Sequence, residues 1–186
     1  MKSNTSGCNC DSALIDIIGL CNPSNITEVI NNYPYWKQMY ISEKLTIPSN
    51  KPDIEQINSV DISVSIIRKK VIKTPTIPIP NIEGKLLSGR KLIIEGQLCQ
   101  KIVYTADIPD QPVHSVHFYV PFSSFIVVPE EVTFEVQNGQ DITRDSLDVN
   151  YEVNSCVEDV SACILDNRSI LKQVTLLLYA VPTQNC

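Results

Sequence analysis

The cysteines carry the most reactive chemistry in this sequence. There are seven in 186 residues, and Cys8 and Cys10 form a Cys-x-Cys pair near the N-terminus. A structural zinc site usually combines two Cys-x-x-Cys or similar pairs, and that spacing does not occur here. We therefore expect no metal site, and the thiols remain available for disulfides. Cysteines near the chain ends favour links between molecules, and an odd total fits either intermolecular pairing or one free thiol. The candidates for intersubunit disulfides are Cys8, Cys10, Cys21, Cys99 and Cys186.

Three cysteines fall within predicted strands. Cys99 has the parity of the polar residues Gln97 and Lys101, so it is expected on the wetter face of its strand and open to linkage. Cys156 and Cys163 have opposite parity in one predicted strand, so they are not expected to pair with each other. One or both fit a buried thiol, which behaves as a small apolar group.

Residue types that commonly carry catalysis lack the required spacing. His114 and His117 are three apart in an alternating strand, so they should face opposite sides and cannot share a metal or form a catalytic pair. Ser123 and Ser124 follow closely, but no Gly-x-Ser-x-Gly turn frames them. The chain also has no calcium-loop pattern and no Gly-rich phosphate loop. We expect neither enzyme activity nor a cofactor.

Composition narrows the classes of partner. Lys and Arg number 15 against 21 Asp and Glu, a net charge of -6, so neither nucleic acid nor anionic lipid is expected as a partner. Apolar residues make up 43% of the chain, yet no uninterrupted apolar run approaches the roughly 20 residues that span a bilayer. No apolar segment of signal-peptide length opens the sequence, so classical secretion is not expected. A single domain of 186 residues buries about 70% of the surface that its unfolded chain exposes, which is enough to form a hydrophobic core.

Residues 1–32 are predicted to form a cysteine-bearing N-terminal arm, of which about the first ten are flexible. The apolar stretch at residues 13–20 fits either a helical face or an extended strand, and this choice stays open. Glu28 stands three residues after Asn25, which resembles a capping box and predicts a short helix ending by Pro34.

From Trp36 onward the apolar period changes to two, which indicates antiparallel strands with one buried face. The alternation is clearest at residues 60–66, 114–120, 132–136 and 170–181. Residues 92–105 are long enough for one bent strand, in which Gly96 marks a bulge or corner. The aromatic residues Tyr35, Trp36 and Tyr40 are predicted as core anchors rather than a ligand platform.

Short Pro-rich segments separate the strands. The segment at residues 74–80 is predicted as an edge or polyproline-like crossover, because proline cannot donate to a ladder. Lys51-Pro52-Asp53 is predicted as a turn whose aspartate accepts backbone hydrogens. Together these patterns predict an all-β fold: an antiparallel β-sandwich, jelly-roll-like, with a short helical segment and a flexible arm.

Two segments are distinctive, Lys-Pro-Asp-Ile-Glu-Gln at residues 51–56 and Val-Pro-Phe-Ser-Ser-Phe at residues 120–125, and Tyr-Trp-Lys-Gln-Met-Tyr at residues 35–40 accompanies them. With these segments the chain resembles the SPOCS domain family of endospore-forming bacteria. The resemblance covers residues 33–181 and leaves a C-terminal tail at residues 182–186 that ends in Cys186. It implies a structural role in the spore envelope, in the coat, exosporium or an appendage.

The leading hypothesis is a self-assembling, non-enzymatic spore-surface subunit, made in the mother cell without a signal peptide. Its copies would meet head to tail and be linked by disulfides from the N-terminal arm, with other spore coat proteins as further partners. One alternative is a monomeric adaptor module in coat assembly. Another is a cytosolic metal-binding protein, for which purified material would contain stoichiometric zinc or iron.

Overall fold

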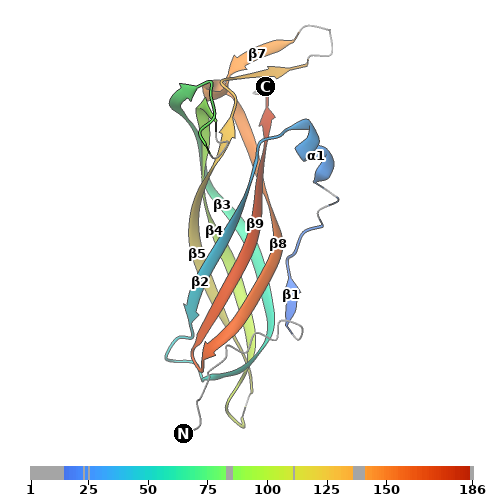
Figure 1. Cartoon of the computed structure of the whole chain (residues 1–186). Helices are drawn as coiled ribbons and strands as arrows, with labels where there is room; N and C mark the ends of the chain where they lie inside the picture. The colour runs from blue at the N-terminus through green and yellow to red at the C-terminus, as the bar shows by residue number, and fades with distance from the viewer. Residues whose placement is uncertain are drawn as a thin grey trace.

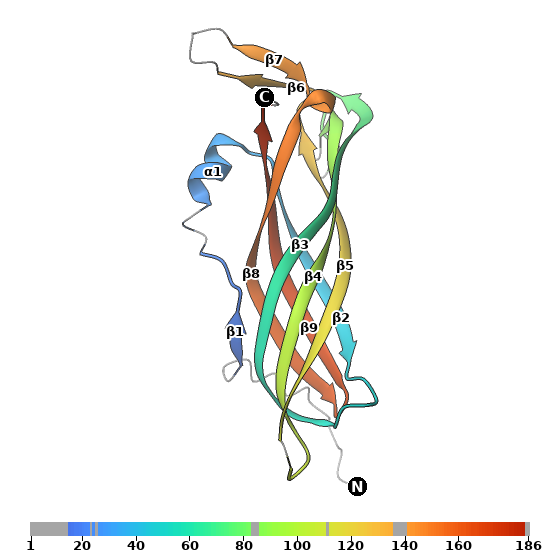
Figure 2. The same ribbon diagram turned by 180° about the vertical axis from the view of Figure 1, so that it is seen from behind.

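Long twisted strands of alternating polarity build an elongated sandwich (Figure 1). The computed structural model of the protein describes residues 15–22, 24, 26–82, 86–110, 112–135 and 141–184. Two sheets face each other along the molecule and a short hairpin projects from one end, which the view from behind also shows (Figure 2). The predicted all-β sandwich with one short helix is confirmed.

The two sheets have the strand orders β2-β9-β8 and β1-β3-β4-β5. The first contains β2 (Trp36–Thr46), β8 (Asn150–Asp166) and β9 (Ser169–Thr183). The second contains β1 (Asp16–Ile18), β3 (Ile54–Ile77), β4 (Leu87–Ala106) and β5 (Val113–Val128). The projecting hairpin is β6 (Glu131–Phe134) and β7 (Ile142–Asp145), followed by a 3-10 turn at Ser146–Asp148. The sequential strands β3, β4 and β5 thus form a meander that faces the other sheet.

The hydrophobic core lies between the two sheets, where the sequence alternation places it. Val60 and Ile62 of β3 are buried while Asp61 between them is exposed, as predicted. Val174 and Leu178 on β9 supply the facing layer and are fully buried. Burial of each such side chain contributes about 1.5–3 kcal/mol relative to exposure, so this alternation determines which face of each strand turns inward.

Gly96 allows a close approach rather than forming a bulge of its own. A side chain at this position would meet the Phe122 ring and the Ser65 carbonyl oxygen at less than 3.0 Å. The irregularity in pairing lies on the neighbouring strand, between Ile66 and Arg68. The predicted single long strand is confirmed, and the role of Gly96 is to make room for Phe122.

The N-terminal segment closes one side of the sandwich. β1 pairs with β3 in parallel, and the backbone N–H of Cys21 donates to the carbonyl of Val157 on β8 at 2.9 Å. The strand alternative left open for this stretch therefore applies to Asp16–Ile18. Since β1 is the edge strand of one sheet and β8 is an edge strand of the other, the segment from β1 to Cys21 bridges the gap between the two sheets.

The predicted short helix is present as α1 (Thr27–Asn32), but its start differs from the expectation. Its N-cap residue is Ile26, which makes no side-chain capping bond. Asn25, the predicted capping residue, lies outside the described residues. Within the described residues, no helix is long and apolar enough to cross a membrane.

Asp53 and Arg168 fasten the turn before β3 to the turn between β8 and β9. The Arg168 guanidinium pairs with the Asp53 carboxylate, and Asn167 Nδ2 donates to the same carboxylate at 2.6 Å. Arg168 also donates to the carbonyl oxygens of Ile47, Pro48 and Lys51. The donors to Asp53 are thus side chains from a distant turn, not the local backbone hydrogens that were expected. The Lys-Pro-Asp segment serves to join two turns at one end of the sandwich.

Candidate functional site

The structure places Cys21 in a disulfide with Cys156 of the same chain. The expectation that Cys21 links different subunits is therefore corrected: its sulfur is used within the molecule. Cys163 also takes part in a disulfide, so neither strand cysteine is a free buried thiol. Cys8, Cys10 and Cys186 lie outside the described residues.

Cys156 and Cys163 do not pair with each other, as expected, because Cys156 pairs with Cys21. The premise that they lie on opposite faces is wrong, and a bulge in β8 explains why. The pairing with β9 shifts between Val157 and Asp159, which adds one residue to β8. Val157 points into the core before the bulge and Val160 after it. Both cysteines therefore lie on the outer face of β8, where the N-terminal segment reaches Cys156.

Cys99 is a free thiol at a partly exposed position on β4. It lies on the outer face, opposite the buried Leu98, as the sequence predicted. Gln97 Nε2 approaches its sulfur at 3.6 Å. Among the cysteines that the structure describes, Cys99 is the one whose sulfur remains available to another molecule.

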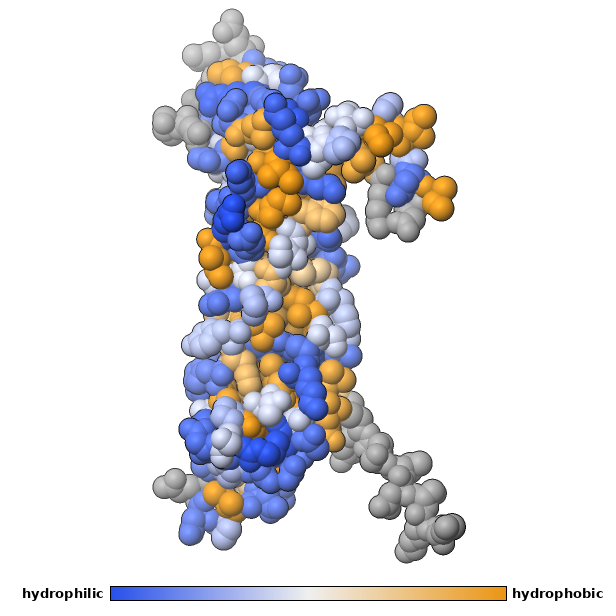
Figure 3. All heavy atoms as spheres, turned by 90° about the vertical axis from the view of Figure 1, so that its left-hand side faces the viewer, coloured by the Kyte–Doolittle hydropathy of each residue, from blue (hydrophilic) through white to orange (hydrophobic). Residues whose placement is uncertain are grey.

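An apolar groove of about 630 Å³ opens where β2 begins and β5 ends. Figure 3 shows hydrophobic residues gathered on this side of the molecule between hydrophilic ones. The most exposed large apolar residue in the groove is Ile79, at 74%. Other exposed apolar residues that line it are Trp36, Ile77, Leu86, Phe125 and Val127. Contiguous exposed apolar surface of this kind usually marks an interaction site.

Two lysines flank the aromatic ring in the groove. Lys37 Nζ lies 4.0 Å and Lys91 Nζ 4.2 Å from the centre of the Phe125 ring. Cation–π contacts contribute about 0.5–1 kcal/mol each at exposed sites. The lysines therefore help to fix the ring while they add positive charge to the rim of the groove.

The groove lies beside two unpaired sheet edges. Among the described strands, β2 pairs with β9 alone and β5 with β4 alone, and the free edges of β2 and β5 are on the same side of the sandwich (Figure 1). Unpaired edges expose backbone donors and acceptors to another chain. Pro121 within β5 and Lys44 within β2 are residue types that limit such pairing.

The prediction that Tyr35, Trp36 and Tyr40 are core anchors is wrong for two of these three residues. Trp36 and Tyr40 are 48% and 60% exposed on β2, so they are surface residues and not core anchors. Tyr35 does pack against the core, where its ring meets that of Tyr151 edge to face. The groove was missed because its residues come from four strands far apart in sequence; the exposed apolar run near Ile77 and Ile79 was its one local signal.

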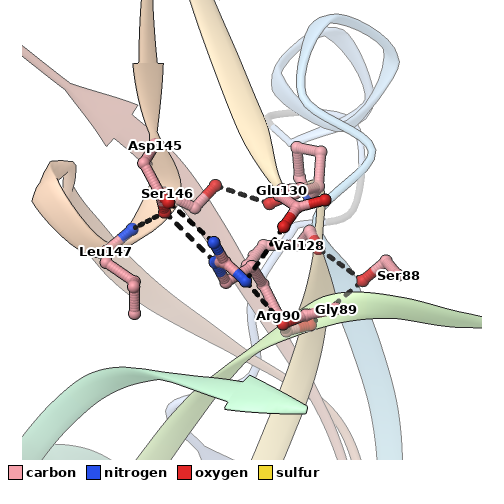
Figure 4. Close-up of polar contacts among 9 residues, drawn as sticks. Ser88, Gly89, Arg90, Val128, Glu130, Asp145, Ser146 and Leu147 are labelled. Carbon is pink, nitrogen blue, oxygen red and sulfur yellow. Dashed lines mark hydrogen bonds and ion pairs between the residues drawn. The ribbon is translucent and has the colours of Figure 1, made fainter. Parts of the chain in front are cut away.

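Arg90 ties the projecting hairpin to the sandwich (Figure 4). Its guanidinium donates to both carboxylate oxygens of Asp145, at 3.1 and 2.6 Å, and pairs with Glu130 at 3.3 Å. The Asp145 carboxylate also accepts from the Leu147 backbone N–H. The Arg90 side chain is almost fully buried, so this network sets the angle at which the hairpin leaves the body.

The Arg90 hydrogen bond lowers the pKa of Asp145, with a further contribution from the Leu147 N–H. A carboxyl group whose pKa is lowered by folding stabilises the protein fully above its unfolded pKa of about 3.9 and loses this contribution as pH falls through its folded pKa. We therefore expect Asp145→Asn to be less stable than wild type at pH 7, with the difference shrinking toward pH 2. Urea unfolding of both proteins across this range measures it. A difference that stayed constant with pH would contradict the role given to this carboxylate.

The remaining candidates for chemistry are dispersed. His114 faces inward beside the Tyr104 ring, and His117 is exposed on the opposite face of β5, as predicted. Ser124 is buried and Ser123 is exposed. Within the described ranges, no group of three or more His, Cys, Asp or Glu residues could hold a metal ion.

Comparison with known families identifies the central part of the chain. The family model described as SipL, SPOCS domain matches residues 53–165, which is more than half of the chain. The match begins at Asp53 and ends in β8. The strands β2 and β9, which complete the sandwich, therefore lie outside the matched range. No curated protein and no solved structure gives a significant match.

Proposed function

Because the chain belongs to the SipL SPOCS-domain family, we propose that it is a structural subunit of the bacterial endospore surface that assembles with copies of itself. The family consists of structural and protein-interaction modules and is not a known enzyme family. A role in the spore follows from membership; self-assembly, cross-linking and position at the surface are the proposal.

The main observation in favour of self-assembly is the apolar groove beside the free edges of β2 and β5. A second copy that covers the groove buries its exposed aromatic and aliphatic side chains, and the adjacent edges offer backbone hydrogen bonds. If the covering surface of the second copy lies elsewhere on the chain, the contact does not close on itself and the assembly grows as a fibre.

Disulfides between copies would make such an assembly permanent. With Cys21 used inside the chain, the proposed link joins Cys99 on the outer face of one copy to Cys8, Cys10 or Cys186 of another. The protein would be made in the mother cell, deposited on the forming spore and oxidised when that cell lyses. Its position in the coat, the exosporium or an appendage is part of the same proposal.

The proposal is tested with the full chain purified without reductant. We expect filaments or arrays in electron microscopy and a ladder of oligomers in non-reducing gels. Phe125→Glu should abolish the assemblies, because it places a carboxylate in the apolar groove, whereas Leu165→Glu at an exposed site on β8 should not. Cys99→Ser should remove the ladder while assembly persists.

Each part of the proposal has its own contradicting result. A wild-type chain that stays monomeric at high concentration excludes self-assembly and favours the monomeric adaptor, for which the groove would be the docking site of another coat protein. Monomer bands without reductant exclude the cross-links. If the Phe125→Glu variant assembles to the same extent as wild type, the interface between copies lies outside the groove.

A further inference from the structure

Three polar side chains meet inside the hydrophobic core. Glu43 on β2 and Lys172 on β9 are directly opposite each other in the pairing of these strands, and both point inward. Gln100 on β4 reaches them from the facing sheet. Lys172 is 0% exposed and Gln100 is 2% exposed, so both are removed from solvent. Gln100 and Lys172 take inward positions that apolar residues fill elsewhere on their strands, such as Leu98 and Val174.

The Lys172 amine and the Gln100 carboxamide both contact one carboxylate oxygen of Glu43. Lys172 Nζ lies 2.5 Å from Glu43 Oε1, and Gln100 Nε2 donates to the same oxygen at 2.9 Å. The two nitrogens are therefore neighbours around a single carboxylate oxygen. The cluster therefore contains a nucleophile (the Lys172 amine), an acyl group (the Gln100 carboxamide) and a proton acceptor (the Glu43 carboxylate).

The polar cluster is incompletely satisfied. Glu43 Oε2 and Gln100 Oε1 are buried without a hydrogen-bond partner, and Lys172 Nζ makes no hydrogen bond beyond its ion pair. Buried ionic and polar groups are costly when their hydrogen-bonding capacity is unmet. A reaction that removes the ammonium charge and one polar group from this core is therefore favoured by its surroundings.

The same surroundings favour the reactive form of lysine. Burial lowers the pKa of Lys172, although the adjacent Glu43 carboxylate acts in the opposite direction. In a medium of low dielectric, transfer of the proton from Nζ to Glu43 leaves a neutral amine beside a neutral carboxylic acid. The neutral amine is the nucleophile in acyl transfer.

We propose that Lys172 and Gln100 form an intramolecular isopeptide bond across the two sheets, with Glu43 as the proton-transfer residue. The neutral Nζ of Lys172 attacks Cδ of Gln100 and the C–N bond forms. Glu43, protonated by the earlier transfer, delivers its proton to Nε2 and then takes the remaining proton from Nζ, the Cδ–Nε2 bond breaks, and ammonia leaves. The products are a secondary amide between Nζ and Cδ and one ammonia molecule, and neither oxidant nor external reactant is required.

The bond would join β9 of one sheet to β4 of the other through the core. A cross-link between residues distant in sequence restricts the unfolded chain and, unlike a disulfide, it survives reductants. Such a protein keeps its two sheets together under conditions that reduce Cys21–Cys156. This inference concerns the single chain and stands whether or not the chain assembles.

Intact-mass spectrometry of the fully reduced wild-type chain tests the inference directly. The expected mass is lower than the sequence mass by one ammonia molecule, and proteolysis should release a branched peptide that joins Lys172 to Gln100. A folded protein with the full sequence mass overturns the proposal. A loss of one water molecule, with Lys172 joined to Glu43, overturns the assignment of Gln100 as the acyl donor.

Variants separate the three roles. Lys172→Met and Gln100→Met should show their full sequence masses because one partner of the bond is absent. Glu43→Gln should also keep its full mass while its circular dichroism remains that of a folded β-protein. Lys44→Met, at the neighbouring exposed position on β2, is the matched control and should show the ammonia loss. A folded Glu43→Gln protein that still lacks ammonia would exclude Glu43 from the proton transfer.

Discussion

Replacement of Lys172 by methionine is expected to lower the free energy of unfolding by roughly 3–5 kcal/mol. The substitution leaves Glu43 in the core without the nitrogen at 2.5 Å that its carboxylate contacts. This value applies to the ion pair of Lys172 and Glu43; in a cross-linked chain the substitution also removes the covalent bond between the sheets, which adds to the loss. Guanidinium unfolding followed by fluorescence measures the change.

Two further variants make this result specific. Lys44→Met removes an exposed lysine from the neighbouring position of β2 and should change stability by less than about 0.5 kcal/mol. The double variant Lys172→Met with Glu43→Leu should recover much of the loss, because apolar replacement of a whole buried pair is often neutral. A Lys172→Met protein as stable as wild type would show that the cluster contributes nothing to folding.

Removal of the Cys21–Cys156 disulfide is expected to cost about 2–5 kcal/mol when both cysteines are changed to alanine. The bond joins positions 135 residues apart, so it restricts a large part of the unfolded chain. It also holds the N-terminal segment against β8, where that segment bridges the two sheets. Thermal unfolding without reductant should show the loss as a lower Tm.

The free thiol provides the control for this experiment. Cys99→Ser changes a partly exposed cysteine that is not in a disulfide, so its Tm should stay close to that of wild type. If the double alanine variant unfolded at the wild-type temperature, the disulfide would carry no stability.

The sequence alone determined the strands and their inward faces. Apolar residues alternate so regularly from Val60 to Ile66 that one register of the strand buries them and the other exposes them. The outward position of Cys99 followed from the same parity. Local periodicity was sufficient here because burial of alternate side chains depends on neighbours within one strand.

Local reasoning was wrong where an extra residue or a distant partner intervened. The bulge between Val157 and Asp159 cannot be read from alternation, and it moved Cys163 to the same outer face as Cys156. Trp36 and Tyr40 have the residue types of core anchors, yet β2 is an edge strand and its outer face is open. Edge position depends on the order of strands, which no single segment encodes.

Only the tertiary structure brought the chemically important residues together. Glu43, Gln100 and Lys172 each occupy an ordinary place in an alternating strand, and their shared oxygen contact exists because the two sheets face each other at that level. The same is true of Asp53 with Arg168 and of the residues around the groove. The sequence thus fixes which face of a strand turns inward through short-range periodicity, whereas packing of the sheets decides which inward and edge residues meet.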